Sequence, residues 1–523
     1  MEEYNKLFVG GDLSGIQKYL YNISSHKAAV SLKGRSAKLC DYMNKCCGEI
    51  ESAAKKAGSK NVERIYCSGG KFYIIIDISE KSEAVFDAID QKAKVIKENL
   101  WKEQKGQLGI NIAYVPFTEN EGGTVNVEGQ YNQNCGKLWR IVNSKFVVQK
   151  NQRYKDILIS QFNDFFWPIA VGEKPKVCAV TGIESNDCVP LYEDVPIDGK
   201  KNFYVLPVVK EQIERGAELM KDYNFETFDH YADGTELGVL RMDVDGLGKR
   251  FIKGFDSIKK YKDYSDVLTD FFENGIKDLQ ETKEYKDNLN IIYAGGDDLF
   301  IVGRWDKVID FAELIHKEVE NASFNDNVND DDKIHISGGI AIVKSTFPIA
   351  KAADLAGEAE YLAKQYDGEE YGYGKKNAFH MLGKTVSWAS PQKGKEKTGL
   401  TSPDTNKALS EFDYVKCYKD KFITLITKHS MSKQILHQIM LYSSIADKNR
   451  ILKDGEPKNY SYIWHLSYYL TRYAKRYEYS SDICKLCYNL RDNELKNERK
   501  LELIALAARW AELILKDELN NIK

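Results

Sequence analysis

The 523-residue sequence has no stretch of about 18 uncharged apolar residues, the length that a helix needs to cross a membrane. Residues 1–6 also lack the basic and then apolar pattern of a secretory signal. An excess of positive charge is missing as well, since 75 Lys and Arg oppose 78 Asp and Glu for a net charge of −3. These absences argue against a membrane protein, a secreted protein and a globally basic nucleic-acid binder, and they predict a cytoplasmic protein. The ten cysteines are then expected to be reduced thiols.

Two parts of the chain share one order of strand and helix patterns. In the first part, apolar runs at 7–12 and 65–76 bound by turn residues predict strands, and helical spacing appears at 16–21 and 37–56. The second part predicts strands at 237–244, 289–293, 299–302 and 334–343, and helices at 265–279, 308–320 and 350–364. A β-α-β-β-α-β order is ferredoxin-like, so the sequence predicts an α+β fold with two copies of this unit.

The rest of the chain is less regular or helical. The predicted organisation is a first palm-type domain at 1–115, a connector subdomain at 116–230, a second palm domain at 231–385, a linker at 386–405 and an α-helical bundle at 406–523. The aromatic residues at 460–473 recur at helical spacing with Leu466 and Leu470. That spacing favours a bundle core over a base-stacking platform.

Two acidic motifs carry the candidate chemistry. Asp243 and Asp245 follow an apolar strand and can share one of its faces, because side chains two residues apart in a strand do so. Asp297 and Asp298 follow Gly295 and Gly296 at a predicted hairpin tip. Carboxylates from neighbouring strands can hold Mg²⁺ or Mn²⁺, and a pair of such ions supports nucleotidyl transfer. The Gly-Gly-Asp-Asp tetrapeptide alone is more simply a polar turn, but Asp243 supplies a second half for a metal site.

Further motifs accompany the acidic ones, at residues 11–17, 31–36, 293–299 and 375–378. With them, the sequence resembles the large signature subunit of type III CRISPR effector complexes, a polymerase–cyclase with two palm domains. The resemblance implies conversion of ATP into cyclic oligoadenylate when target RNA binds, in a complex with other effector subunits and guide RNA. By position, Asp297 and Asp298 match the catalytic hairpin and Asp243 matches the upstream metal ligand.

The resemblance also implies a set of nucleotide-binding residues. These are Gly295, Gly296, Val244, Asp245, Gly246, Ser14, Gly15, Gln17, Gly69, Gly70 and Lys375. For Ser14, Gly15 and Gln17, a turn that caps a helix is an equal alternative. Lys33 and Arg35 flank Gly34 in a predicted basic loop, for which a phosphate or RNA contact and a solvated turn are equally good interpretations.

Three departures from the family pattern refine the expectation. The sequence has no His-Asp dipeptide, so we expect no HD-type nuclease activity. The hairpin of the first palm reads Ser68-Gly69-Gly70-Lys71, without carboxylates, and is expected to bind a nucleotide without a catalytic metal. In the part of the connector where the family often carries four zinc-binding cysteines, this sequence has only Cys178 and Cys188, so zinc is not expected.

Three alternatives remain open at this level. The same site can join AMP to S-adenosylmethionine instead of to a second adenylate. A free-standing diguanylate-type cyclase shares the metal chemistry, although the double palm and the helical bundle argue against it. A catalytically silent nucleotide-binding scaffold is the alternative from a different class, and the three aspartates argue against that.

Overall fold

The computed structural model describes residues 4–23, 28–78, 82–119, 125–127, 130–165, 174–191, 203–220, 228–232, 236–253, 255, 257–326, 328, 333–391, 399–402, 407–450, 456 and 458–520. Contacts group the chain into two compact units: Met1–Ala232 with Gly246–His335 and Ser345–Asp354, and Asp233–Asp245 with Ile336–Lys344 and Leu355–Lys523. Within the described residues, no helix is both long enough and apolar enough to cross a membrane.

The first sheet has the strand order β2-β3-β1-β4-β5-β6. Its strands are β1 (Lys6–Ser14), β2 (Val62–Ser68), β3 (Lys71–Asp77), β4 (Gly109–Glu119), β5 (Val125–Val127) and β6 (Gln130–Gln133). The central strand β1 pairs antiparallel with both β3 and β4, so that Gly11 lies opposite Phe72 on one side and Ile112 on the other. The order of the first four strands is the ferredoxin-like one, which confirms the predicted fold class.

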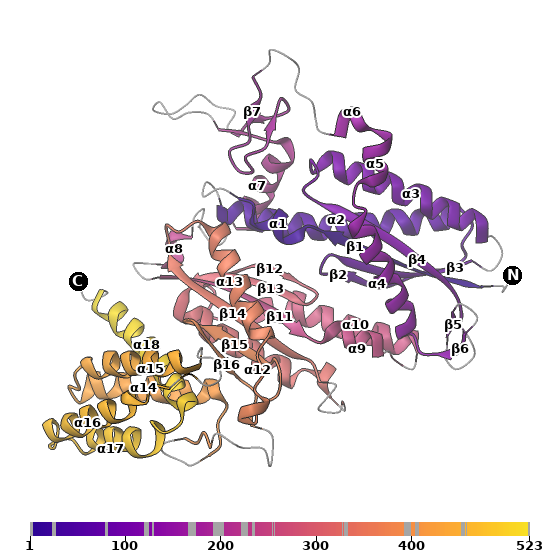
Figure 1. Ribbon diagram of the computed structural model, residues 1–523. Coiled ribbons are helices and arrows are strands. Elements are labelled where there is room, and N and C mark those ends of the chain that lie inside the picture. Colours follow the sequence, from indigo (N-terminus) through magenta and orange to yellow (C-terminus); the bar gives the residue numbers. More distant parts are fainter. Residues whose placement is uncertain are drawn as a thin grey trace. The chain divides into compact units, whose positions relative to one another are not determined.

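Helices cover this sheet on both faces (Figure 1). The helices α2 (Ala28–Lys56) and α3 (Ser82–Glu103) pack against each other and against its strands. On the other face, α4 (Gly136–Asn151) buries Trp139 in a cluster with Phe8 and Tyr73. Because α4 completes the core of this sheet, packing of the first palm continues well past residue 115.

The second palm repeats the arrangement with the strand order β12-β13-β11-β14-β15-β16. Its strands are β11 (Glu236–Asp245), β12 (Leu289–Gly295), β13 (Asp298–Arg304), β14 (His335–Lys344), β15 (Ala378–Met381) and β16 (Lys384–Ser387). Its helices include α9 (Leu247–Lys253), α10 (Ile258–Asp270), α11 (Ile276–Gln280), α12 (Trp305–Asn321) and α13 (Ile349–Lys364). A π-helical turn, Phe271–Gly275, joins α10 to α11 within the region predicted as one helix.

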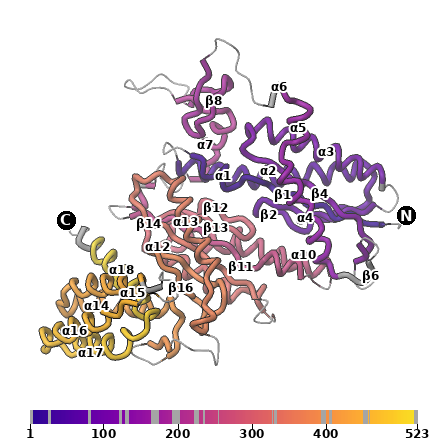
Figure 2. The backbone as a smooth tube through the Cα atoms, viewed as in Figure 1, coloured from indigo at the N-terminus to yellow at the C-terminus, as the bar shows by residue number. Residues whose placement is uncertain are grey.

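Within the first unit, α10 runs beside β2 (Figure 2), and α9 contacts α4. The rings of Trp139 on α4 and Tyr261 on α10 stack with their centroids 3.5 Å apart. Ile258 joins the same buried cluster. The first palm and this part of the second palm therefore share one core.

The predicted basic loop around Gly34 is wrong, because these residues lie inside α2. Arg35 is buried and donates hydrogen bonds to the backbone oxygen of Tyr19, at 2.5 Å, and to Gln212 Oε1, at 3.2 Å. Lys33 donates to the backbone oxygen of Ile291 at 2.6 Å. A Cβ atom on Gly34 would lie 1.7 Å from the oxygen of Gln212, so this glycine allows α2 and α7 (Pro207–Leu219) to pack closely. Both interpretations of the loop are therefore overturned.

The C-terminal helices form a bundle, as predicted. They are α14 (Glu411–Lys428), α15 (Gln434–Arg450), α16 (Ser461–Arg476), α17 (Ser481–Asn489) and α18 (Glu498–Asn520), with a π-helical turn at Leu490–Glu494 (Figure 1). Ser410 caps α14 by accepting a hydrogen bond from the backbone N–H of Asp413 at 3.0 Å. The predicted linker at 386–405 lies partly outside the described residues, and its first two residues belong to β16.

Candidate active site

The acidic hairpin of the second palm has a two-residue turn. Gly295 on β12 pairs with Asp298 on β13, which leaves Gly296 and Asp297 at the tip. Gly296 has a φ of +67°, a conformation that favours glycine, and the N–H of Asp297 donates to the oxygen of Gly295 at 2.9 Å. The local sequence therefore fixes both carboxylates at the end of a tight turn.

The acid-free hairpin of the first palm is built in the same way and touches the acidic one. Ser68 pairs with Lys71, and Gly69 and Gly70 form the turn with φ values of +58° and +78°. A Cβ atom on Gly69 would lie 2.8 Å from the oxygen of Gly295 and 2.9 Å from the Cα of Gly296. The two glycine turns are thus in direct backbone contact within the first unit, and a side chain at Gly69 would separate them.

A hydrogen bond fixes the acid-free hairpin in this position. Ser68 Oγ donates to Glu273 Oε1 at 2.5 Å, and Glu273 belongs to the π-helical turn between α10 and α11. π-Helical turns inside longer helices frequently occur at functional sites. Here the turn supplies the carboxylate that anchors the first hairpin against the second.

Asp297 has an unusual proton affinity. The pKa of Asp297 is raised to about 6, chiefly because the side chain is buried; Lys71 of the facing hairpin opposes this increase, and the neighbouring Asp298 carboxylate contributes to it. The carboxylate charge of Asp297 is therefore poorly solvated by the protein alone. A cation held by this carboxylate would stabilise the charge.

The β11 carboxylates have different partners. Asp245 is buried and accepts hydrogen bonds from Ser337 Oγ at 2.5 Å and from the backbone N–H of Asn377 at 3.1 Å. These bonds hold the segment that follows α13 against β11. Asp243 instead forms an ion pair with Lys364, the last residue of α13. The pKa of Lys364 is lowered to about 8, chiefly because the side chain is buried and also because Lys376 and Arg241 are close.

Asp243, Asp297 and Asp298 form one candidate metal group. One carboxylate oxygen from each residue lies within 4.8 Å of the other two, and all three residues are partly buried. Among the described residues, this is the only group of three or more His, Cys, Asp or Glu with such spacing. Three carboxylates at the end of a sheet match the oxygen ligands that Mg²⁺ and Mn²⁺ prefer.

The structure connects the other predicted site residues less directly with the candidate metal group. Val244 is buried, and Gly246 turns with a φ of +77° beside open space. Lys375 lies 3.1 Å from the Asp367 carboxylate and 3.8 Å from that of Glu369, so its charge is already balanced by acids. The basic residue that meets a candidate metal ligand is instead Lys364, which no sequence motif marked.

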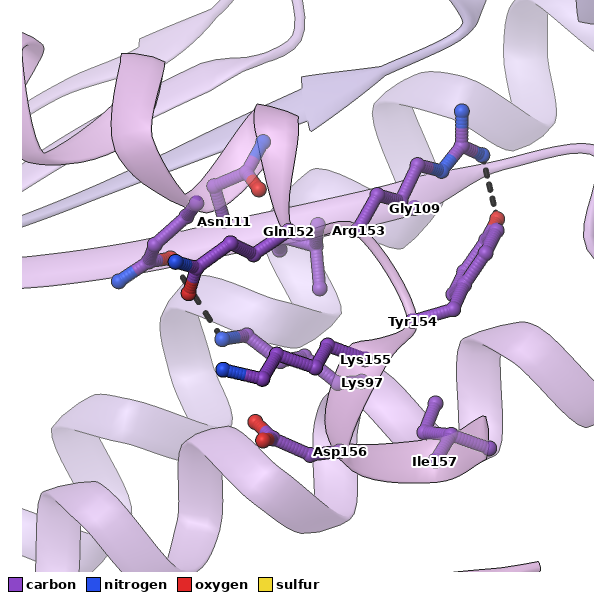
Figure 3. A pocket seen from close by; sticks show the side chains of 11 residues that line it. Lys97, Gly109, Asn111, Gln152, Arg153, Tyr154, Lys155, Asp156 and Ile157 are labelled. Atoms are coloured by element: carbon purple, nitrogen blue, oxygen red, sulfur yellow. Dashed lines mark hydrogen bonds between the residues drawn. The ribbon is translucent and has the colours of Figure 1, made fainter. Parts of the chain in front are cut away.

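The Ser14–Gly15 turn lies beside a small polar pocket of the first unit. Ser14 Oγ donates to the oxygen of Gly109 at 3.3 Å, and Gly15 packs against Arg153. In this pocket, Lys97, Gln152, Lys155 and Asp156 point toward a common space, whereas Arg153 turns away toward Tyr154 (Figure 3). Gln17 is exposed on α1 (Ile16–Tyr21).

Comparison with known protein families identifies the fold and its two halves. Residues 236–372 match the second palm domain of Cas10/Cmr2, and residues 5–168 match domain B of the Csm1 subunit. In both of these regions the chain is similar to the Cas10/Csm1 family. It is therefore related to the large subunit of type III CRISPR effector complexes, as the sequence motifs indicated.

Curated relatives carry the description "CRISPR system single-strand-specific deoxyribonuclease Cas10/Csm1 (subtype III-A)". The relative from Enterococcus italicus is 27% identical over 418 residues, which cover 69% of this chain and 52% of the relative. The relative from Methanocaldococcus jannaschii is 25% identical over 486 residues, which cover 73% of this chain and 59% of the relative. The chain thus spans somewhat more than half the length of these Cas10/Csm1 relatives.

Solved Csm1 structures share the fold at low sequence identity. A Csm1-Csm4 cassette in complex with cA4 has a TM-score of 0.61 and 18% identity, covering 98% of this chain and 70% of the other. A Csm1-Csm4 cassette in complex with AMPPNP has a TM-score of 0.59 and 19% identity, covering 97% and 70%. These Cas10/Csm1 structures place the double-palm and helical-bundle architecture in a known fold.

Proposed function

We propose that the chain is a metal-dependent nucleotidyltransferase of a type III CRISPR effector complex, which converts ATP into cyclic oligoadenylate. The observation that carries this proposal is the group formed by Asp243, Asp297 and Asp298 at the end of the second palm sheet. The related fold in complexes with cA4 and with AMPPNP supports the choice of adenine nucleotides as substrate and product.

The three aspartates would hold Mg²⁺ or Mn²⁺. When bound there, the metal supplies Lewis-acid charge for the attack of a 3′-hydroxyl on the α-phosphate of ATP and for the departure of pyrophosphate. Gly295 and Gly296 leave the backbone open for a close approach of phosphate. Asp297, with its pKa raised to about 6, is ionised for metal binding above that pH.

Lys364 adds a mobile positive charge to the same site. Its ammonium group is partly buried and paired with Asp243. A triphosphate brings negative oxygens that compete with Asp243 for this ammonium group. Lys364 is therefore suited to transfer from the carboxylate to the triphosphate when ATP and metal enter together.

The first palm would present the second nucleotide. Its hairpin lies in backbone contact with the acidic hairpin and contributes Lys71 toward Asp297, but no carboxylate. A nucleotide held there needs no metal of its own, and its 3′-hydroxyl faces the reacting centre of the second palm. One active centre per chain follows from this division of roles. The proposed contacts of the acceptor nucleotide are Ser14, Gly15, Gly69 and Gly70.

The proposal includes partners. The similar solved structures contain Csm1 together with Csm4, which supports assembly of this chain with other effector subunits. Guide RNA and target RNA complete the proposed complex, with target binding as the trigger for synthesis. Zinc has no proposed role, because the expected zinc-binding stretch of the connector offers only Cys178 and Cys188 where structural zinc needs four ligands.

The test replaces Asp297 and Asp298 by alanine in the assembled complex. With target RNA, Mn²⁺ and ATP, pyrophosphate release should be abolished while the complex still assembles. Asp482→Asn, an exposed change on α17, is the matched control. Undiminished release from the double variant would refute the site assignment.

Mass spectrometry of the products distinguishes the acceptor. Cyclic oligoadenylate formed from ATP alone supports the proposal. A product that contains both AMP and S-adenosylmethionine, formed only when both substrates are supplied, would replace oligoadenylate synthesis by conjugation at the same carboxylates. No product under either condition, with nucleotide still bound, would support the silent scaffold.

A further inference from the structure

The helix α16 has two different aromatic faces. Its inner face buries Tyr462, Leu466 and Leu470, which confirms the prediction of a bundle core. Tyr460, Trp464 and Tyr468 lie outside that core, with 53%, 61% and 60% of their surfaces exposed. Trp464 and Tyr468 are four residues apart on α16 and lie on the same side of it. Tyr460 is the residue that precedes the helix, four positions before Trp464, and we call these three rings the ridge.

The ridge is organised by contacts with neighbouring side chains. The ring of Trp464 stacks on His465 with centroids 3.5 Å apart, and His465 stacks in turn on Tyr442 of α15 at 6.1 Å. Arg472, one turn beyond Tyr468, donates from Nη1 to the tyrosine hydroxyl at 3.0 Å and lies over its ring. The rings of Trp464 and Tyr468 therefore each have a side-chain partner on the surface of the bundle.

The charged residues of α16 itself have one sign. Residues 461–476 contain no Asp or Glu, whereas Arg472, Lys475 and Arg476 are all exposed on this helix. This is unusual for a protein with a slight overall negative charge. A partner that fits the ridge must offer flat apolar groups together with negative charge, a combination that single-stranded nucleic acid provides.

We infer that the ridge of Tyr460, Trp464 and Tyr468, with Arg472 at its end, is a stacking platform for single-stranded RNA. Successive rings are about 6 Å apart along the helix axis, given a rise of about 1.5 Å per residue. That interval is wider than the rise of about 3.4 Å in a duplex strand, so it suits an extended strand with one base per ring. The exposed cations would contact the phosphates. The inference goes beyond nucleotidyl transfer and does not depend on it.

The test measures RNA binding by the full chain. A fluorescent oligouridylate of about 12 nucleotides, within the usual range of single-strand sites, reports binding by anisotropy. The double variant Trp464→Ala/Tyr468→Ala should bind at least about ten-fold more weakly, whereas Trp464→Phe should retain most of the affinity because a ring remains. Phe162→Ala is the matched control, since Phe162 on α6 (Phe162–Phe165) is 63% exposed and lies outside the bundle.

Further readouts distinguish base stacking from purely ionic binding and from a protein contact. Binding of the oligouridylate should quench tryptophan fluorescence in the wild type, and duplex RNA of the same length should bind more weakly. Wild-type affinity in the double variant, an equal preference for duplex RNA, or no binding by the wild type would each overturn the inference. Unchanged RNA affinity with loss of a co-assembling subunit would assign the ridge to a protein partner instead.

Two controls keep the result interpretable. The double variant should keep its circular-dichroism spectrum and melting temperature, because both replaced side chains are mainly exposed. Asp297→Ala/Asp298→Ala should bind the oligouridylate like the wild type. These variants show separately whether the RNA-binding inference is wrong and whether the proposed catalytic site is wrong.

Discussion

Lys364 at the end of α13 forms an ion pair with Asp243, the β11 member of the candidate metal group. Both side chains are mostly buried, with 23% and 15% of their surfaces exposed. The ammonium group therefore occupies a carboxylate that the proposed metal would also use. Metal and lysine compete for Asp243 unless the triphosphate of ATP gives Lys364 a new partner.

Replacing Lys364 by methionine should change metal and nucleotide binding in opposite directions. Mn²⁺ binding without nucleotide should strengthen, because the competing ammonium is gone. The KM for ATP should rise at least about ten-fold, since a charge-assisted hydrogen bond contributes about 1.5–3 kcal/mol and about 1.4 kcal/mol is a factor of ten. Calorimetric titration with Mn²⁺ and product formation against ATP concentration measure the two effects.

Lys351→Met is the control for this change, because Lys351 is an exposed lysine on the same helix. It should leave both quantities unchanged. Equal weakening of Mn²⁺ and ATP binding by Lys364→Met would show that the lysine only supports the local structure.

Asp297→Asn should stabilise the metal-free protein above about pH 6. A pKa raised from 3.8 to about 6 means that the folded state binds this proton more tightly than the unfolded state does. Stability is therefore lost as the pH rises from about 4 to about 6, and the loss reaches about 3 kcal/mol above that range. The asparagine variant carries no charge to bury and avoids this loss.

Unfolding by urea with a chelator present measures the effect at about pH 4.5 and at about pH 7.5, near the two ends of this titration. The stabilisation by Asp297→Asn should appear at the higher pH and largely disappear at the lower one. Asp278→Asn, an exposed change on α11, should have no such dependence. A stabilisation that is equal at both pH values would exclude the titration of Asp297 as its cause.

Local patterns were enough to predict the elements that carry the candidate site. The apolar runs predicted strands close to their observed limits, and the glycine pairs marked both hairpins. The pairing of Asp243 with Asp297 and Asp298 followed from recognising two separate motifs as parts of one unit. Each apolar run, glycine pair and acidic motif occupies only a few neighbouring residues. All of them could therefore be found without the tertiary structure.

Other features depend on packing and were missed or misread. Lys364 resembles an ordinary basic residue in the last turn of a helix, where positive charge is favoured by the helix dipole. Gly34 resembles a turn residue, but its role is to let another helix approach α2. The aromatic residues of α16 were assigned to the core as a group, although only the inner half of them is buried. In each case, the role of the residue depends on what packs against its side chain. The neighbouring residues in the sequence do not contain that information.

Replacing Lys71 by methionine should shift the pH dependence of metal binding. Lys71 lowers the pKa of Asp297, so its loss raises that pKa further above its ordinary value. Protonated Asp297 is a poor metal ligand, and the acidic limb of Mn²⁺ binding should therefore move to higher pH. Affinity well above this limb should change little.

Mn²⁺ titrations from about pH 5 to about pH 8, a range that brackets the pKa of about 6, measure the shift. Lys94→Met provides an exposed lysine control on α3 of the same palm. A uniform loss of Mn²⁺ affinity at every pH would point to damaged hairpin packing, and an unchanged profile would contradict the electrostatic coupling of the two hairpins.

Replacing Arg499 by methionine should strongly destabilise the unit that contains the bundle. Arg499 on α18 is buried and bonds to both Glu411 carboxylate oxygens at 2.7 and 2.6 Å, and to Glu502 at 2.7 Å. Glu411 also accepts hydrogen bonds from Tyr366 and from the backbone of Ser387, so this network ties α14 and α18 to β16. Loss of one partner leaves buried charge uncompensated, which costs about 3–5 kcal/mol.

Chemical denaturation monitored by tryptophan fluorescence measures this loss, and a second replacement tests its cause. Glu411→Gln in the Arg499→Met background removes one uncompensated charge and should restore part of the stability. Arg509→Met is the matched control, because Arg509 forms an exposed ion pair with Glu512 on the same helix, and such pairs contribute at most about 1 kcal/mol. If the double variant is no more stable than Arg499→Met, lost packing rather than buried charge explains the effect.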